Sequence, residues 1–201
     1  MTKVLYLGMS QDVLLPLNLV PDCDTIFVID LVQYGFSRRR TQTSICADIA
    51  RILSRGRYDN WDYKLETGTR IALHAESRVG NRWQLDFDVD GQAKTLVRYE
   101  GDFFNEWPAD VCDITHFMAP GAFSVEFLRD NATFRQMFLT RLAPTCALFF
   151  DCLPWTGLSV PDRLLRNITQ TTYTKEALCV AAVDTRHADW IETTFSQATF
   201  T

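Results

Sequence analysis

The sequence lacks the short motifs by which many nucleotide-binding and hydrolytic enzymes are recognised. It contains no G-x-G-x-x-G run, which dinucleotide-binding folds use to approach a pyrophosphate, and no G-x-x-x-x-G-K-[ST] phosphate loop. It also contains no G-x-S-x-G sequence, which in α/β-hydrolases places a nucleophilic serine on a tight turn. These absences argue against an NAD(P)-binding enzyme, a P-loop NTPase and an α/β-hydrolase.

Metal-binding and disulfide patterns are also missing. The chain has three histidines and six cysteines, and no two cysteines form a CxxC pair. A zinc site needs Cys and His clustered at short spacings, so we expect no metal site. Cys146 lies in an apolar run, where a free thiol behaves as a small hydrophobic side chain. The sequence therefore predicts reduced, buried thiols in a reducing intracellular compartment, the cytoplasm.

Neither a secretory signal nor a membrane span is expected. Met1 leads directly into strand-like residues, and no apolar run approaches the roughly 20 residues that cross a bilayer. The formal net charge of −5 argues against a broad nucleic-acid-binding surface. Arg38, Arg39 and Arg40 form a dense basic run, which is either solvated surface or a contact for a phosphate or an acidic partner.

The chain does contain the pattern of one α/β domain, which its 201 residues suit. Residues 4–7 and 25–29 are apolar runs typical of buried parallel strands. Between them we expect a short helical stretch, with Ser10 as its N-cap and Pro16 in its first turn. Residues 43–53 place their apolar side chains on one face of a helix. Strand, helix and strand in succession predict a mostly parallel sheet flanked by helices.

Residues 61–99 follow a different pattern. Apolar and polar residues alternate from Trp83 to Val89, which indicates a strand with one buried and one solvated face. Turn sequences precede and follow this strand. We therefore predict an antiparallel β-meander added to the α/β core, with strands at 69–74, 83–89 and 94–99. Its tryptophans, Trp61 and Trp83 together with the neighbouring Trp107, are either core residues or a partner-facing surface.

The second half of the chain returns to the α/β pattern. Pro144 is expected to mark the end of a long helix, and the last two strands are expected to pair with each other. The expected strands are 109–115, 145–150, 177–183 and 190–195, and the expected helices are 123–142 and 161–168.

Three segments carry a resemblance to a known family. They are residues 4–12 (Val-Leu-Tyr-Leu-Gly-Met-Ser-Gln-Asp), residues 26–30 (Ile-Phe-Val-Ile-Asp), and residues 96–102 followed by 107–116. The layout resembles the Rossmann-like class I S-adenosylmethionine-dependent methyltransferases, over most of the chain and by element order more than by identity. The opening is also similar to uncharacterised methyltransferase-like proteins whose first loop reads Leu-Tyr-x-Gly-x-x-x-Asp.

The resemblance implies S-adenosylmethionine as cofactor. It implies that Gly8 and Ser10 lie in the cofactor loop, where a glycine lets the backbone approach a ligand. Asp30 would accept hydrogen bonds from the ribose hydroxyls. Asp102 would accept from the adenine amino group, with Phe103 or Phe104 packing on the ring. Each residue also has an alternative, structural role: Gly8 as a turn glycine, Asp30 as a helix cap or loop carboxylate, and Asp102 as a turn aspartate.

His116 is the candidate catalytic residue. We expect it just past the strand 109–115, at the carboxyl edge where open α/β sheets bind ligands. There it would orient or deprotonate a substrate. A hydrogen-bonded structural histidine is the alternative. Asp151 and Trp155 are expected near the same edge.

Two functions therefore remain open. The first is an S-adenosylmethionine-dependent methyltransferase of unknown substrate, since methyl transfer needs positioning and a dry site more than a dedicated nucleophile. The second is a methyltransferase-like domain that has lost catalysis and serves as a protein-binding or assembly module. The single glycine of the first loop and the added meander favour the second. An open cleft at Asp30, Asp102 and His116 would favour the first.

Overall fold

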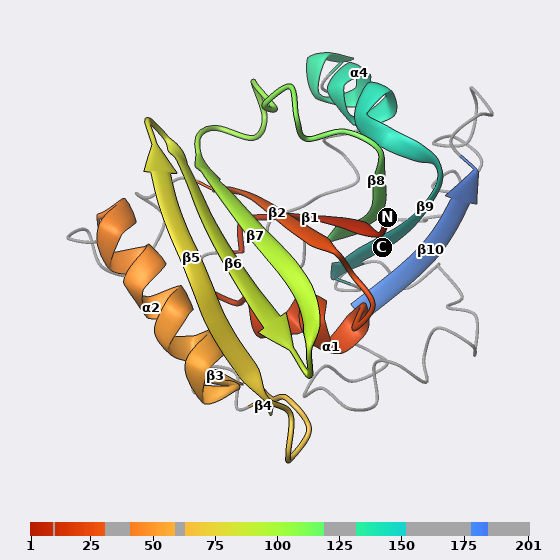
Figure 1. The fold of residues 1–201 in the computed structure, drawn as a ribbon. Coiled ribbons are helices and arrows are strands. Elements are labelled where there is room, and N and C mark those ends of the chain that lie inside the picture. The colour runs from red at the N-terminus through yellow and green to blue at the C-terminus, as the bar shows by residue number, and fades with distance from the viewer. Residues whose placement is uncertain (10, 31–40, 59–62, 119–131, 152–177, 185–201) are drawn as a thin grey trace.

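The computed structural model describes residues 1–9, 11–30, 41–58, 63–118, 132–151 and 178–184 (Figure 1). These residues form one eight-stranded sheet, one two-stranded sheet and three helices. The strands of the large sheet are β1 (Lys3–Leu7), β2 (Thr25–Asp30), β5 (Ile71–Val79), β6 (Arg82–Val89), β7 (Gln92–Glu100), β8 (Ile114–Met118), β9 (Leu142–Asp151) and β10 (Leu178–Asp184). The small sheet pairs β3 (Arg57–Tyr58) with β4 (Tyr63–Lys64), and the helices are α1 (Leu14–Leu19), α2 (Gln42–Arg55) and α4 (Ala132–Arg141).

The large sheet is mixed and mostly parallel, with the order β10-β9-β8-β1-β2-β7-β6-β5. Strands β9, β8, β1, β2 and β7 run parallel to one another, whereas β10, β6 and β5 pair antiparallel at the two sides. Numbered along the chain, the five parallel strands have the order 3-2-1-4-5, the order of doubly wound, Rossmann-like sheets. The chain order reverses between β1 and β8, which is the switch point where such sheets bind ligands.

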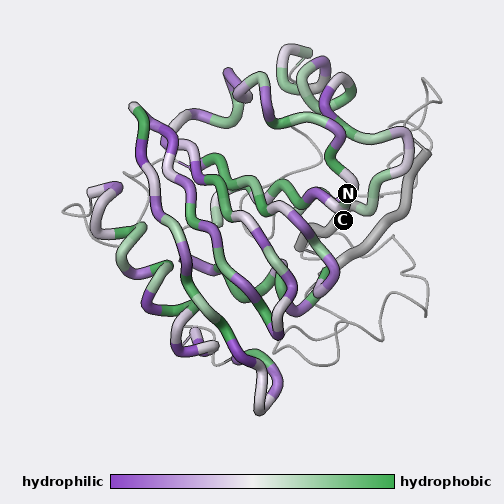
Figure 2. Tube along the Cα trace, viewed as in Figure 1, coloured by the Kyte–Doolittle hydropathy of each residue, from purple (hydrophilic) through white to green (hydrophobic). Residues whose placement is uncertain are grey.

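The central strands are buried on both faces. Four of the five residues of β1 and all six residues of β2 are buried, and apart from Lys3 and Asp30 the two strands consist of β-branched and other apolar residues. In Figure 2 the trace of β1 and β2 is mostly hydrophobic, whereas hydrophobic and hydrophilic residues alternate along β5, β6 and β7. The expected distinction between a buried parallel core and a half-exposed meander is therefore confirmed.

Helices cover the two faces of the sheet in two separate layers. Val4 and Tyr6 of β1 pack into a core cluster with the apolar residues of α1 and α2. Leu5 and Leu7 point the other way, into a second cluster with Phe134 and Phe138 of α4. The helices that connect β1, β2 and β7 thus share one face, and α4, which connects β8 and β9, lies on the opposite face (Figure 1).

Helix α2 has clear end signals. Thr41 accepts a hydrogen bond from the Ser44 N–H (3.2 Å), and the Ser44 hydroxyl accepts in return from the Thr41 N–H (3.1 Å), which forms a capping box. Gly56 ends the helix with φ +59°, a left-handed conformation that glycine adopts without steric cost. The expected amphipathic helix 43–53 is confirmed, with one or two more residues at each end.

The meander is part of the main sheet. Tight turns at Gly80–Asn81 and at Asp90–Gly91 connect β5 to β6 and β6 to β7, as predicted. Its last strand, β7, pairs in parallel with β2, so β7 serves as the third parallel strand of the core. The predicted start at residue 61 is wrong, because β4 pairs with β3 and the first long strand begins at Ile71.

The strand predicted at 109–115 lies instead at Ile114–Met118. Asp113 has φ +55°, and Val111 closes a turn by donating to the Pro108 carbonyl oxygen (3.0 Å), so the chain turns over 108–113 before it enters the sheet. Val111 is nevertheless fully buried, which explains its apolar character. As a result His116 lies in the middle of β8 and not beyond its end.

Helix α4 ends at Arg141, one residue before the predicted end, and β9 begins directly at Leu142, so Pro144 lies inside a strand. The predicted strand at 177–183 is confirmed as β10, and its partner is β9. The helix at 161–168, the strand at 190–195 and the start of the helix at 123–142 lie outside the described residues. So do Ser10, Arg38, Arg39, Arg40, Trp61 and Trp155.

Four cysteine side chains lie in the described part of the chain, and none of them forms a disulfide. Cys23, Cys46 and Cys146 are buried. Burial raises the pKa of the Cys23 and Cys46 thiols to about 11 and that of Cys146 to about 12. These thiols are therefore protonated core residues with little nucleophilic character. Within the described residues, no helix has the length and apolarity needed to cross a membrane.

Candidate functional site

The carboxyl ends of β1, β2 and β7 lie side by side at one edge of the sheet. The Gly8 N–H donates to the Ile29 carbonyl oxygen (3.2 Å), and the Gly101 N–H donates to the Asp30 carbonyl oxygen (3.1 Å). These two bonds extend the parallel pairing past the strand ends and hold the loops together. The structure therefore brings three predicted cofactor positions, Gly8, Asp30 and Asp102, to one edge next to the switch point.

Gly8 has a backbone conformation that favours glycine. Its φ is +64°, in the left-handed region that side chains with a Cβ avoid. The following residues turn inward, because Met9, Gln11 and Asp12 are all buried. The Gln11 amide reaches across to α2 and donates to Asp48 (2.5 Å). Helix α1 begins only at Leu14, with Val13 as N-cap, so the predicted capping role of Ser10 is wrong.

Asp12 is a buried acid in the same loop, and it was missing from the residues predicted for the site. One of its carboxylate oxygens accepts from the Tyr6 hydroxyl (3.1 Å), and the other accepts from the Leu15 N–H in the first turn of α1 (3.3 Å). Burial raises its pKa to about 7, although both hydrogen bonds oppose that shift. The Leu-Tyr-x-Gly-x-x-x-Asp pattern contains this aspartate and is the signal that pointed to it.

Asp12→Asn is expected to remove a pH-dependent loss of stability. An unfolded aspartate has a pKa of about 4, so between about pH 4 and 7 the folded state binds more protons than the unfolded state, and stability falls as pH rises. The fall reaches at most about 4 kcal/mol and is complete above about pH 7. Urea unfolding at pH 5 and pH 8 measures it in wild type, in Asp12→Asn and in the exposed control Asp113→Asn. Equal pH dependence in all three proteins would contradict the assignment.

Asp30 is the last residue of β2, and its side chain is 10% exposed. Its carboxylate faces Arg98 of β7, with 3.8 Å between Oδ2 and Nη2. Arg98 is completely buried. Arg98 was not among the residues predicted for the site, although an arginine between the apolar residues Val97 and Tyr99 was a visible signal.

Asp102 caps a turn after β7. One of its oxygens accepts from the Phe104 N–H (3.0 Å) and the other from the Asn105 side-chain amide (2.6 Å). These bonds match the structural alternative, a turn aspartate after Gly101. Each carboxylate oxygen has a second lone pair, so Asp102 retains the capacity to accept from a ligand.

An aromatic cluster packs against the turn that follows β7. Phe103 is buried, whereas Phe104 is only partly buried, so of the two predicted stacking residues Phe104 has the accessible ring. The Trp107 indole N–H donates to the Phe103 carbonyl oxygen (2.8 Å). Trp107 itself is buried, with ring centroids 5.8 Å from Phe134 and 6.2 Å from Phe138. Trp107 and Trp83 are thus core residues and do not form a partner-facing surface.

His116 is not at this edge. It pairs in register with Val4, on the face that carries α1, and its Nδ1 lies 3.0 Å from the Thr115 hydroxyl. Burial lowers its pKa, while Asp22 raises it to a smaller extent. Asp22 lies in the loop that leads into β2, at the amino end of the strands. These contacts match the structural alternative for His116.

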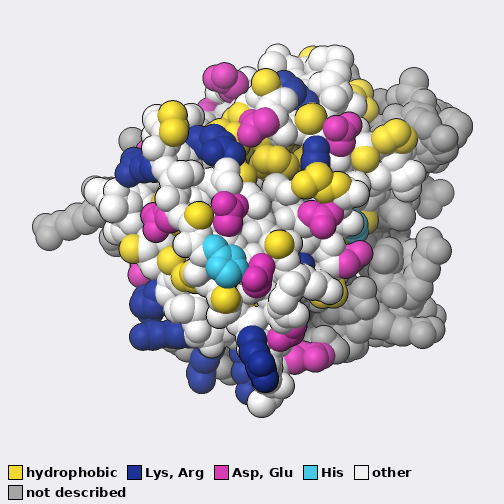
Figure 3. Space-filling view, viewed as in Figure 1, with side chains coloured by type: hydrophobic (Ala, Val, Ile, Leu, Met, Phe, Trp, Pro, Cys, Tyr) yellow, Lys and Arg dark blue, Asp and Glu magenta, His cyan; other side chains and the backbone are white. Residues whose placement is uncertain are grey.

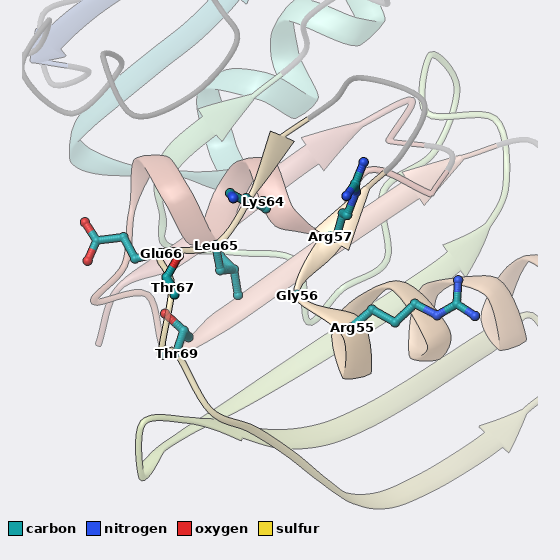
Figure 4. A pocket seen from close by; sticks show the side chains of 9 residues that line it. Arg55, Gly56, Arg57, Lys64, Leu65, Glu66, Thr67 and Thr69 are labelled. Carbon is teal, nitrogen blue, oxygen red and sulfur yellow. The ribbon is translucent and has the colours of Figure 1, made fainter.

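The other described surfaces are weaker candidates for a ligand site. A cavity of about 240 Å³ lies beside the C-terminal end of α2. In Figure 4 the charged side chains that line it, Arg55, Arg57, Lys64 and Glu66, point in different directions and do not converge on a ligand. The face drawn in Figure 3 carries acidic, basic and histidine side chains interspersed over β5, β6 and β7. One pair on these strands is His74 with Asp88 (2.7 Å). Within the described residues, no group of three His, Cys, Asp or Glu side chains is placed to hold a metal ion.

Comparison with known proteins gives no match to any family model and none to a curated protein sequence. The assignment of a function therefore depends on the fold and on the geometry of the edge formed by β1, β2 and β7.

Proposed function

We propose that this protein is an S-adenosylmethionine-dependent methyltransferase that binds its cofactor at the carboxyl ends of β1, β2 and β7. One observation carries the proposal. Gly8 in its left-handed conformation, Asp30 and the Gly101–Asp102 turn are adjacent at the switch-point edge of a 3-2-1-4-5 sheet. This is the arrangement that the resemblance of residues 4–12, 26–30 and 96–102 implies.

The chemistry of these residues fits a nucleoside with a charged sulfonium tail. Asp30 is a carboxylate at the strand end whose side chain keeps 10% exposure, and a carboxylate can accept from both hydroxyls of a ribose. Gly8 leaves the backbone at the end of β1 without a Cβ, so a ligand can approach it closely. Phe104 offers part of its ring for an adenine. When bound, the cofactor supplies an electrophilic methyl group, and the protein aligns the acceptor with it.

Isothermal titration with S-adenosylmethionine and with S-adenosylhomocysteine tests the proposal. We expect micromolar binding of both ligands to the wild-type protein, with adenosine binding more weakly because it lacks the amino-acid tail. Adenosine serves as the internal control, since it shares the ribose and adenine contacts. Absence of heat for both cofactors at millimolar concentration would exclude the methyltransferase function.

A catalytically inactive, methyltransferase-like module that binds a protein partner is the second candidate. It is favoured by the way in which Met9, Gln11 and Asp12 fill the loop after β1 with their own side chains. Such a module would give no cofactor heat and would retain a protein partner in pull-down experiments. Cofactor titration therefore separates the two functions.

A further inference from the structure

Arg98 is an arginine inside the apolar core. Its exposed fraction is 0%, and in register it lies between Val28 of β2 and Trp83 of β6, both buried. Leu96, two residues earlier on the same face of β7, belongs to the core cluster shared with α1 and α2. An arginine keeps its charge under all physiological conditions, so a full positive charge is buried here.

Among the described residues, the three guanidinium nitrogens of Arg98 have no hydrogen-bond partner. A buried charge without partners is strongly unfavourable, and proteins retain one only where an opposite charge compensates it. The carboxylate of Asp30, at 3.8 Å from Nη2, supplies that charge. The pair is therefore held by charge attraction across a short gap, with no hydrogen bond between the two groups.

The two residues are diagonal neighbours on the sheet. Asp30 is in register with Glu100, and Arg98 is two residues before Glu100 on the same strand. The guanidinium consequently lies on the inner side of the carboxylate, while the side chain of Asp30 keeps its 10% exposure at the edge. One carboxylate thus faces a buried cation on one side and the candidate ligand edge on the other.

We propose that Arg98 is a positioning residue that keeps Asp30 ionised and oriented toward the ribose of a bound nucleoside. The inference rests on the proposed function and adds a residue that does not touch the ligand. An ionised carboxylate accepts from both hydroxyls of a ribose, whereas a protonated carboxyl must donate one hydrogen itself. Arg98 therefore makes ribose binding independent of pH through the neutral range.

Among the described residues, two other charged side chains near the pair have hydrogen-bond partners of their own. Arg78 of β5 donates to Gln42 (3.0 Å) and to Thr43 (2.8 Å) at the start of α2. Glu76 of β5 accepts from the Trp83 indole (2.8 Å). Two further titratable groups lie near the pair. They are the Cys46 thiol of α2, which burial keeps protonated, and Glu100 at the end of β7, which is in register with Asp30. Arg78 is thus a nearby arginine outside the pair and provides a matched control.

Carboxyl ¹³C NMR titration, with the Asp30 resonance assigned from Asp30→Asn, tests the pair directly. In the wild-type protein Asp30 is expected to stay ionised from about pH 8 down to about pH 5. In Arg98→Met its protonation is expected to move up by about two units or more, to about pH 6, because the buried carboxyl loses a neighbouring cation. Arg98→Lys should restore most of the wild-type titration, and Arg78→Met should leave it unchanged.

Affinity for S-adenosylhomocysteine supplies the functional readout. We expect Arg98→Met to bind about tenfold more weakly at pH 7 and to weaken further toward pH 6, while Arg78→Met binds as wild type at both values. Unchanged Asp30 titration in Arg98→Met, or a shifted titration with unchanged affinity, would overturn the proposal. If Arg98→Met does not fold, the Asp30 titration in the wild-type protein still tests the inference. Protonation of wild-type Asp30 near neutral pH would contradict it. If wild type binds no cofactor, the proposed function fails while the titration still tests the pair.

Discussion

Asp30→Asn is expected to weaken binding of S-adenosylhomocysteine by about 10- to 100-fold in isothermal titration, because a hydrogen bond to a charged group contributes about 1.5–3 kcal/mol. The substitution preserves the shape of the side chain and removes its charge. Adenosine, which shares the ribose contact, should lose affinity by the same factor. A loss for S-adenosylhomocysteine without a loss for adenosine would place Asp30 at the amino-acid tail and contradict the assigned contact.

Asp30→Asn also leaves Arg98 without its carboxylate, and breaking a buried pair costs about 3–5 kcal/mol of stability. Asp30→Glu separates the two effects. It retains a charge for Arg98 but moves the carboxylate by one methylene, so we expect near-normal stability and weakened binding. Asp24→Asn is the matched control at the opposite end of β2, where Asp24 accepts from the Thr2 N–H (2.5 Å). Equal loss of cofactor affinity in Asp24→Asn and Asp30→Asn would contradict a site at the carboxyl edge.

Trp107→Ala is expected to lower the free energy of unfolding by about 3–5 kcal/mol, the usual cost of removing a large buried aromatic side chain. Trp107 packs between Phe117 of β8 and Phe138 of α4, so its removal leaves a cavity between the sheet and that helix. It also removes the indole hydrogen bond to the Phe103 carbonyl oxygen, which holds the turn after β7. Guanidinium chloride unfolding followed by circular dichroism measures the loss.

Trp107→Phe is the matched control for this substitution. It retains most of the ring packing and removes the hydrogen bond, so we expect a loss of about 1–2 kcal/mol. At a temperature where each variant is folded, Trp107→Phe should also bind S-adenosylhomocysteine more weakly than wild type, because the Phe104 ring is less firmly held. Phe87→Leu, in the core cluster on the opposite face of the sheet, should lose stability without this effect. A loss below about 1 kcal/mol in Trp107→Ala would contradict its place in the core.

The elements that the sequence predicts well are those whose pattern reflects one dominant force. The apolar runs of β1 and β2 have too few polar groups to lie at the surface, and the alternation from Trp83 to Val89 indicates a half-buried strand. The capped, amphipathic helix α2 was predictable for the same reason. Local sequence also predicted both turns of the meander, because Gly80 and the Asp90–Gly91 pair adopt positive φ there.

The errors have a common physical cause, which is tertiary context. Val111 is apolar because it is buried in a turn, and that made residues 109–115 resemble a strand and displaced His116 to the edge. The helix before Pro144 ends as expected, but β9 begins directly at Leu142 and so includes the proline. No local pattern indicates that β7 pairs with β2 or that Arg98 faces Asp30, because both depend on residues about 70 positions apart in the chain.

The most direct test of the cofactor edge is an amide ¹H–¹⁵N titration of labelled protein with S-adenosylhomocysteine. We expect the resonances of Gly8, Asp30 and Gly101 to move together with one dissociation constant, since these residues are adjacent at the strand ends. Gly91, in the turn at the opposite edge of the sheet, should not move. Shifts confined to Gly56 and Gly68, which line the cavity beside α2, or no shifts at all, would contradict a cofactor site at the ends of β1, β2 and β7.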